Sequence, residues 1–206
     1  MTDLNDPRSW FVEPFFAALL DGVPDAAEVR ARLERETEDL LDQTEDLVVD
    51  EAARSHVVLT AYAVAAYRWL QGRVADPLDA VREAVVGPFG EWMADTVRAE
   101  LDQAPDPFAA MVANLREQEK SFYGKGFAWE RVVDDDRAIL SRAHRCVYHD
   151  ASTRLGAPEL TAAVWCEWDK PMLAAVDPDR HGMRAARPVT IGYGCDHCDF
   201  AFERTT

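Results

Sequence analysis

Apolar side chains follow a helical spacing over most of the first 120 residues. Between residues 6 and 20 an aromatic stripe begins after Asp6-Pro7, a pair typical of a helix start. Residues 50–70 leave almost no polar face, which predicts a buried central helix. Residues 25–47 alternate Arg and Glu at three- and four-residue spacing and predict a largely solvent-facing helix. Helices are also expected at residues 76–103 and 106–121, the first with a break or kink at Gly87-Pro88 because proline lacks an amide donor.

The pattern changes to alternation after residue 126. Residues 127–133 and 138–148 flank an Asp-rich turn and predict an antiparallel hairpin. Helical patterns return at residues 150–156 and 158–176, and strands are expected at residues 183–193 and 198–204. On the last strand Cys198, Phe200 and Phe202 face one side, and Asp199, Ala201 and Glu203 face the other.

This order of elements predicts an α+β fold. We expect an N-terminal helical layer packed on a small, roughly four-stranded antiparallel sheet with two inserted helices. The 206 residues are enough to bury a sizeable core. We interpret residues 1–206 as a single domain, with a helical part over 1–122 and a hairpin-helices-hairpin part over 123–206 that carries the site.

Composition narrows the choice of partners and compartment. A net charge of −16 argues against nucleic acid or an anionic membrane as a partner. No basic segment followed by an apolar one opens the chain, and the most apolar run, residues 57–67, is shorter than the roughly 20 residues of a spanning helix. We therefore expect a cytoplasmic protein with free thiols. The N-terminal aromatic stripe suits either the core or the face of a homodimer.

The residue types that carry chemistry crowd into the last third of the chain. Apart from His56, every histidine and cysteine follows residue 140. Cys146 and His149 are three residues apart, as are Cys166 and Asp169. This spacing suits a metal chelate or a nucleophile with its base, although the absence of paired CxxC motifs gives zinc little support. Free cysteines are also commonly buried core residues, and Cys166 lies in an apolar run typical of that role.

Four segments carry a resemblance to a known family. They are Cys146-Val147-Tyr148-His149-Asp150, Leu155-Gly156-Ala157-Pro158-Glu159-Leu160, Trp165-Cys166-Glu167-Trp168-Asp169 and Gly194-Cys195-Asp196-His197-Cys198-Asp199-Phe200-Ala201-Phe202. Over about residues 120–204 the chain resembles the L-2-amino-thiazoline-4-carboxylic acid hydrolase family. That family commonly has a basic residue between the two closing aromatics, where this chain has Ala201, and Arg184 or Arg187 is expected to take its place.

The resemblance implies a hydrolase of non-peptide carbon–nitrogen bonds that needs no cofactor. It would open a carbon–nitrogen or carbon–sulfur bond in a cyclic amidine or thiazoline. Cys198 is the expected nucleophile, or the thiol that orients a water, with His149 as acid and base and Asp169 orienting it or holding the amidinium. Cys166 and Cys146 are second candidates for the nucleophile. Arg184, Asp199 and Trp165 are the expected substrate-binding residues.

Two alternatives of other classes remain open. One is a metal- or haem-binding protein holding zinc or haem iron, with ligands drawn from Cys146, His149, Cys166, Asp169, Cys195 and Cys198. The other is a non-catalytic module that binds a small ligand and whose thiols belong to the core.

Overall fold

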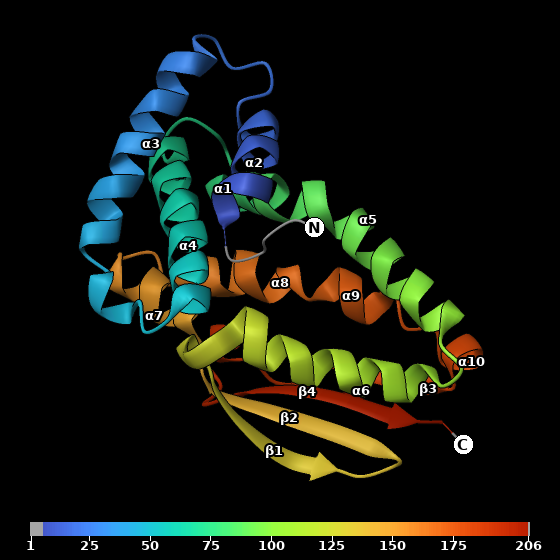
Figure 1. Cartoon of the computed structure of the whole chain (residues 1–206). Helices are drawn as coiled ribbons and strands as arrows, with labels where there is room; N and C mark the ends of the chain where they lie inside the picture. Colours follow the sequence, from blue (N-terminus) through green and yellow to red (C-terminus); the bar gives the residue numbers. More distant parts are fainter. Residues whose placement is uncertain (1–5, 206) are drawn as a thin grey trace.

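The structure, a computed structural model, describes residues 6–205. Helices come first along the chain and a four-stranded sheet follows, so the fold is α+β as predicted (Figure 1). The helical elements before the sheet are α1 (Pro7–Trp10), α2 (Val12–Leu19), α3 (Ala26–Asp42), η1 (Glu45–Leu47), α4 (Glu51–Leu70), α5 (Pro77–Gln103), α6 (Pro107–Gln118), η2 (Glu119–Tyr123) and η3 (Gly124–Gly126). The later elements are β1 (Ala128–Asp134), β2 (Ala138–Arg145), α7 (Val147–Arg154), η4 (Thr161–Trp165), α8 (Cys166–Trp168), α9 (Lys170–Ala174), α10 (Pro178–His181), β3 (Met183–Ala186), η5 (Ile191–Tyr193) and β4 (Cys198–Arg204).

Helix α4 is buried along most of its length, as its apolar pattern predicts. Asp50 caps its first turn, since the Asp50 carboxylate accepts the amide of Ala53 at 2.7 Å. The same carboxylate also accepts the amide of Lys125 at 2.7 Å. Asp50 thereby joins the start of α4 to the turn that precedes the sheet. Gly124 is needed in that turn because it has a φ of +60° and packs directly on Asp50.

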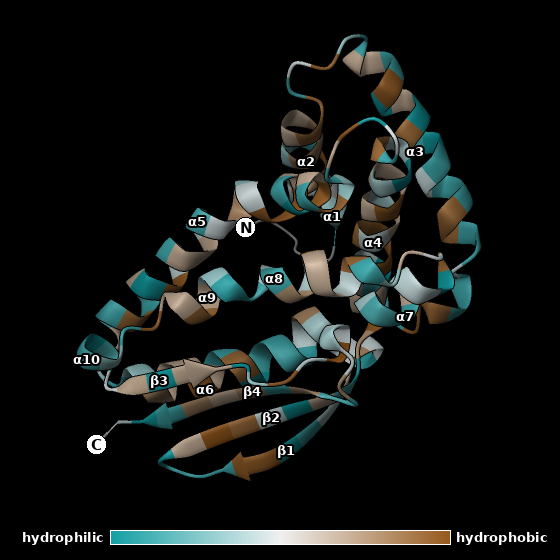
Figure 2. Cartoon of the chain, turned by 180° about the vertical axis from the view of Figure 1, so that it is seen from behind, coloured by the Kyte–Doolittle hydropathy of each residue, from teal (hydrophilic) through white to brown (hydrophobic). Residues whose placement is uncertain are grey.

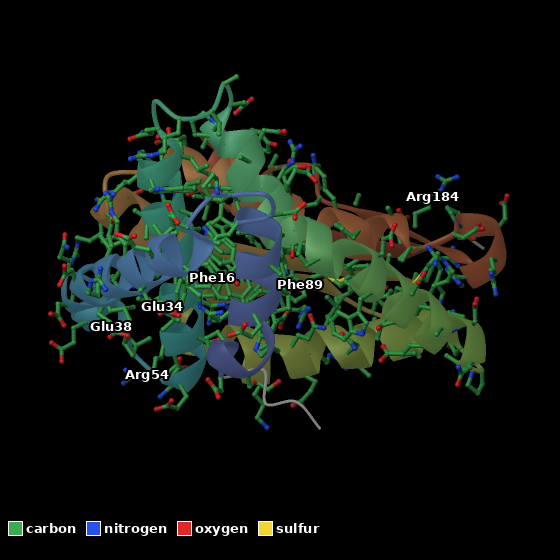
Figure 3. All side chains as sticks on the ribbon, turned by 90° about the horizontal axis from the view of Figure 1, so that it is seen from above. Phe16, Glu34, Glu38, Arg54, Phe89 and Arg184 are labelled. Carbon is green, nitrogen blue, oxygen red and sulfur yellow. The ribbon has the colours of Figure 1, made fainter. Side chains whose placement is uncertain are left out.

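The helical layer is held together by aromatic and aliphatic side chains between α2, α4 and α5. Phe11 stacks on Phe15 and Phe89 with ring centroids 5.1 and 5.8 Å apart. In Figure 3, seen from above, Phe16 and Phe89 point into this interior. Helix α3 buries one narrow face, and its ribbon alternates hydrophilic and hydrophobic colours (Figure 2). The predicted solvent-facing character of this helix is confirmed.

The expected break at Gly87-Pro88 does not occur, because α5 continues through Pro88 as one helix. Proline at this position removes the bond to the carbonyl four residues earlier. The buried face continues on both sides of it, with Val81 and Val85 before the proline and Phe89 after it. Packing of that face compensates for the missing bond and keeps the helix continuous.

The sheet is antiparallel throughout, with strand order β1-β2-β4-β3. Strand β4 therefore lies between β2 and β3, and the predicted β1–β2 hairpin is confirmed. Two strands are shorter than expected. Strand β2 ends at Arg145, and α7 begins at Val147, inside the segment expected to be strand. Strand β3 ends at Ala186, before the end of the strand expected over residues 183–193. The helix expected over residues 158–176 is divided into η4, α8 and α9.

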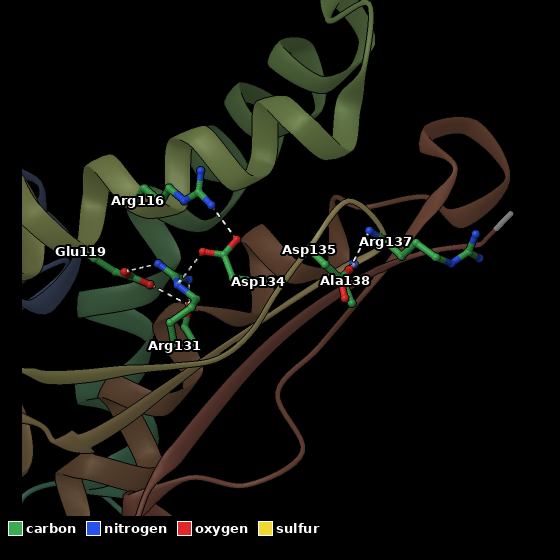
Figure 4. Close-up of polar contacts among 8 residues, drawn as sticks. Arg116, Glu119, Arg131, Asp134, Asp135, Arg137 and Ala138 are labelled. Carbon is green, nitrogen blue, oxygen red and sulfur yellow. Dashed lines mark hydrogen bonds and ion pairs between the residues drawn. The ribbon is translucent and has the colours of Figure 1, made fainter.

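Helix α6 covers one face of the sheet (Figure 1). Phe108, Met111 and Leu115 of α6 pack in one cluster with Ile139 and Phe202. Ion pairs fix the hairpin to the helices, as Figure 4 shows. Arg116 contacts Asp134 at 2.6 Å and Arg131 contacts Glu119 at 2.6 Å. Because α6 packs on Ile139 and Phe202, the inner sheet face is largely apolar and covered, as the alternation along residues 198–204 predicts.

Among the described helices, including the long α4 and α5, none has the length and unbroken apolar stretch that crossing a bilayer requires.

Candidate functional site

An enclosed cavity lies between the inner face of the sheet and the helical segments on either side of it. Its volume is about 30 Å³, enough for about two water molecules. Eight of the residues that line it are aromatic: Phe122, Tyr123, Phe127, Trp129, Tyr148, Trp165, Trp168 and Phe200. The remaining lining includes three thiols, one carboxylate and one guanidinium. Such convergence of a few polar groups in an apolar hollow is typical of a ligand site.

Two π-helical turns contribute to this wall. Phe122 and Tyr123 come from η2, and Thr161 and Trp165 come from η4. Isolated π-turns widen a helix by one residue and occur frequently at functional sites. Both turns lie in segments that the sequence pattern predicted as regular helix or as the end of one.

Cys198 opens β4 and lies opposite Ala143 of β2. Because Ala143 is small, it leaves open space beside the sulfur, and both residues line the cavity. The amide of Ile191 donates to Cys198 Sγ at 3.2 Å, and Arg187 Nη2 donates to it at 3.8 Å. Burial raises the pKa of the Cys198 thiol, while the Ile191 amide and the Arg187 guanidinium oppose that shift.

Cys166 lies at the start of α8 and points into the same space. Its Sγ donates to Thr190 Oγ1 at 3.5 Å and accepts from Arg187 Nη2 at 3.8 Å. Arg187 Nη2 lies 3.8 Å from the sulfur of Cys166 and also 3.8 Å from the sulfur of Cys198. The two sulfurs can therefore be no farther apart than twice that distance. Gly192 packs so closely that a methyl group there would lie 2.6 Å from Cys166 Sγ. Residues 190–194 therefore form a tight cover over the two thiols, which we call the covering segment.

Arg187 is the polar centre of the cavity. Its Nη1 contacts Asp169 Oδ2 at 2.9 Å and the Cys166 carbonyl at 3.0 Å. The guanidinium carbon lies 4.7 Å from the centre of the Phe200 ring, in cation–π range. Burial acts to lower the pKa of Arg187, but Asp169 and the two thiols outweigh it and raise this pKa. Arg187 therefore stays charged and provides a fixed positive charge between both sulfurs.

Asp169 is the carboxylate that lines the cavity. Burial raises the pKa of Asp169, and Arg187 and a hydrogen bond with Tyr123 oppose this shift. Desolvation of the half-buried Tyr123 hydroxyl, together with the charge of Asp169, raises the pKa of Tyr123 well above the ordinary value. The Tyr123 hydroxyl is therefore protonated at neutral pH and is held beside a carboxylate whose proton affinity is increased.

Cys146 and His149, which share a three-residue spacing, differ in their access to the cavity. Cys146 lines the cavity, and burial raises its pKa far above the ordinary thiol value. His149 does not line the cavity. Its Nδ1 lies 3.4 Å from Thr161 Oγ1, and Thr161 does line it. His149 therefore contacts the cavity only indirectly, through its hydrogen bond with the lining residue Thr161.

The three expected substrate-binding residues are also separated. Trp165 lines the cavity. Asp199 lies on the opposite face of β4, where it pairs with Arg142 at 2.8 Å, and that pair lowers the pKa of Asp199. Arg184 is exposed and points outward at the far end of the molecule in Figure 3. Cys195 lies in the turn before β4 and is outside the lining.

Within residues 6–205 no three His, Cys, Asp or Glu side chains converge closely enough to hold a metal ion. The described residues therefore contain no cluster of the three or more ligands that a zinc site uses.

Residues 53–202 match the L-2-amino-thiazoline-4-carboxylic acid hydrolase family. This segment spans most of the chain. The protein belongs to that family. The match begins well before residue 120, so membership extends beyond the resemblance seen in the sequence and takes in α5, α6 and nearly all of α4. Every residue that lines the cavity falls inside the matched segment. No curated protein and no solved structure matches the chain.

Two residues of the cavity, Arg187 and Tyr123, are not marked by any local sequence pattern. The sequence suggests Arg187 only as a replacement for the basic residue that the family has in place of Ala201, and it does not mark Tyr123 as a site residue. Arg187 lies in a segment without regular structure after β3, where no periodicity marks its direction. The available signal was chemical: Arg187 follows a strand that leads towards the thiol-bearing β4, and Tyr123 belongs to an aromatic run at a change of structure.

Proposed function

We propose that this protein is a small-molecule hydrolase that opens a carbon–nitrogen or carbon–sulfur bond of a cyclic amidine or thiazoline, with Cys198 as nucleophile. The observation that carries the proposal is the environment of the Cys198 sulfur. It contacts the Ile191 amide at 3.2 Å and the Arg187 guanidinium at 3.8 Å inside an enclosed cavity. Membership of a hydrolase family supports the same reaction class.

These donors act on the charged form of the sulfur. A thiolate is the reactive species, and nearby cationic and amide donors stabilise it relative to the thiol. Burial alone would keep Cys198 protonated. Proton removal therefore needs a base, and Asp169 is suited to accept a proton because burial raises its pKa. His149 has no direct access to the cavity, so we assign it a supporting role through Thr161.

The reaction would proceed in two balanced stages. The Cys198 thiolate adds to the ring carbon that lies between two heteroatoms. The bond from that carbon to one heteroatom breaks, and the leaving atom takes the proton held by Asp169. Water then adds to the same carbon and gives one proton to Asp169, and the bond to sulfur breaks to return the thiolate. Arg187 and the Ile191 amide would stabilise negative charge on the sulfur at both ends of this cycle.

The proposal can be tested with variants of Cys198 and Cys195. Wild type, Cys198→Ser, Cys198→Ala and the matched control Cys195→Ser would be incubated with a panel of 2-aminothiazoline acids and cyclic amidines. Ring opening would be followed by liquid chromatography with mass detection. We expect Cys195→Ser to retain the wild-type rate, since Cys195 is outside the cavity. Both Cys198 variants should lose at least about a thousandfold in rate.

A covalent adduct on Cys198, trapped by acid quench and located by peptide mass, would support the nucleophile assignment. Turnover retained in Cys198→Ala would refute it. The ligand-binding alternative makes the opposite prediction, because it expects panel members to bind to wild type without ring opening.

A further inference from the structure

His56 is the one histidine in the first half of the chain, and the proposed reaction does not use it. It lies on α4 and its exposed fraction is 0%. Four aromatic rings enclose the imidazole, namely Phe122, Tyr123, Phe127 and Tyr148, with centroids between 4.8 and 6.1 Å away. All four of these residues also line the thiol cavity. His56 therefore stands directly behind the aromatic wall.

The hydrogen bonds of His56 determine which nitrogen carries its proton. Nε2 lies 2.8 Å from the Phe122 carbonyl oxygen, and Nδ1 lies 2.7 Å from the Tyr148 hydroxyl. A carbonyl oxygen can only accept, so Nε2 must donate. A neutral imidazole has one N–H, which leaves Nδ1 as an acceptor and makes the Tyr148 hydroxyl its donor. Burial lowers the pKa of His56 to about 4, so the ring is neutral at pH 7.

The two partners belong to different walls of the cavity. The Phe122 carbonyl lies near the end of η2, where a helix leaves carbonyls without partners of its own. Tyr148 lies in the first turn of α7 and stacks on Trp165, with centroids 4.4 Å apart and planes within 11°. His56 thereby ties α4 to η2 on one side and to the Tyr148–Trp165 stack on the other.

We propose that His56 is a positioning residue that fixes both aromatic walls of the cavity as the neutral Nε2–H tautomer. It also engages the only proton of the Tyr148 hydroxyl. Tyr148 cannot then donate to a bound molecule, and the Tyr123 hydroxyl has its own proton engaged by the Asp169 carboxylate. The predicted effect on turnover rests on the proposed function, but the tautomer and the wall geometry do not.

Replacing His56 with asparagine or with glutamine tests its hydrogen bonds to Tyr148 and to the Phe122 carbonyl separately. The side-chain amide of His56→Asn can occupy the Nδ1 position and accept from Tyr148. The amide of His56→Gln reaches the Nε2 position and can donate to the Phe122 carbonyl. Tyr148→Phe removes the hydroxyl from the other side. His144→Asn serves as the matched control, because His144 is exposed on the outer sheet face and distant from this wall.

The spectroscopic readouts need no substrate. ¹⁵N NMR of wild-type imidazoles should show His56 with a protonated Nε2 and an unprotonated Nδ1, and the ring should remain neutral until the pH approaches its pKa of about 4. Near-UV circular dichroism reports the Tyr148–Trp165 stack. We expect His56→Asn and His144→Asn to keep that signal, and His56→Gln and Tyr148→Phe to lose it. An Nδ1–H tautomer, or an unchanged signal in both loss variants, would overturn the proposal.

Kinetics then distinguish this inference from the proposed function. If a substrate is found, His56→Gln should lose about 100-fold in kcat, a size typical of misplaced site groups, with little change in KM, and His56→Asn should recover most of it. Equal kcat in wild type and His56→Gln would refute the positioning role alone. If the whole panel is inert while the NMR and dichroism results hold, the positioning role stands and the proposed function fails.

Discussion

Replacing Arg187 with methionine tests the polar centre of the cavity. Methionine keeps an unbranched apolar chain over Phe200 but removes the charge that faces Asp169 at 2.9 Å. The Arg187 and Asp169 side chains are only 11% and 12% exposed, so the remaining carboxylate would be buried without its partner. Breaking one side of a buried pair costs about 3–5 kcal/mol. We expect the free energy of unfolding at pH 7 to fall by about that amount.

The pH dependence of this loss has a definite sign. Burial raises the folded-state pKa of Asp169 above its unfolded value, and removing Arg187 takes away the main opposing charge. The folded variant then binds the Asp169 proton more tightly than the unfolded chain does. Its stability relative to wild type should therefore increase as the pH falls from 7 through the folded-state pKa towards the unfolded value.

Urea unfolding followed by tryptophan fluorescence at pH 7 and pH 5 measures both effects. The double variant Arg187→Met with Asp169→Asn is the control, since it removes the carboxylate that causes the penalty. It should be more stable than Arg187→Met at pH 7 and should lack the extra pH dependence. An equal loss at both pH values, or a double variant no more stable than the single one, would refute the buried-pair reasoning.

Three further predictions concern glycine packing and the buried histidine. Gly124→Ala should lower the free energy of unfolding by about 2–4 kcal/mol, because φ is +60° and the methyl group would meet the Asp50 cap at 2.6 Å; a urea midpoint equal to that of wild type would contradict this. Gly192→Ala should displace the covering segment and speed iodoacetamide labelling of Cys166, measured by peptide mass, and slower labelling would count against it. Because the pKa of His56 falls from 6.5 to about 4 on folding, wild type should lose about 3 kcal/mol between pH 6.5 and pH 4 that His56→Asn does not lose.

The alternation and the buried helix could be predicted from the sequence because each rests on a local period. Cys198, Phe200 and Phe202 face the core from β4 with the predicted bounds, and α4 is buried as its composition indicates. The family was recognised from segments that all fall within or next to the matched region. These features depend on residues close together in the sequence.

The assembly of the site depends on contacts between distant segments, so spacing alone gave only part of it. Cys146 and His149 share a three-residue spacing, but Cys146 precedes α7 and is not governed by its period, so only Cys146 lines the cavity. Arg187 meets Asp169 across 18 positions of sequence that include two short helices and a strand. No local pattern could show that this arginine, and not Arg184, turns inward.

The small volume of the cavity also has a kinetic consequence. A space of about 30 Å³ is too small for a five-membered ring with substituents, so a ligand can enter only after the covering segment or a wall has moved. Opening then precedes binding, and the observed association rate should reach a plateau as ligand concentration rises. The height of that plateau would be the opening rate of the fold itself, and it would be the same for every ligand that enters by this route.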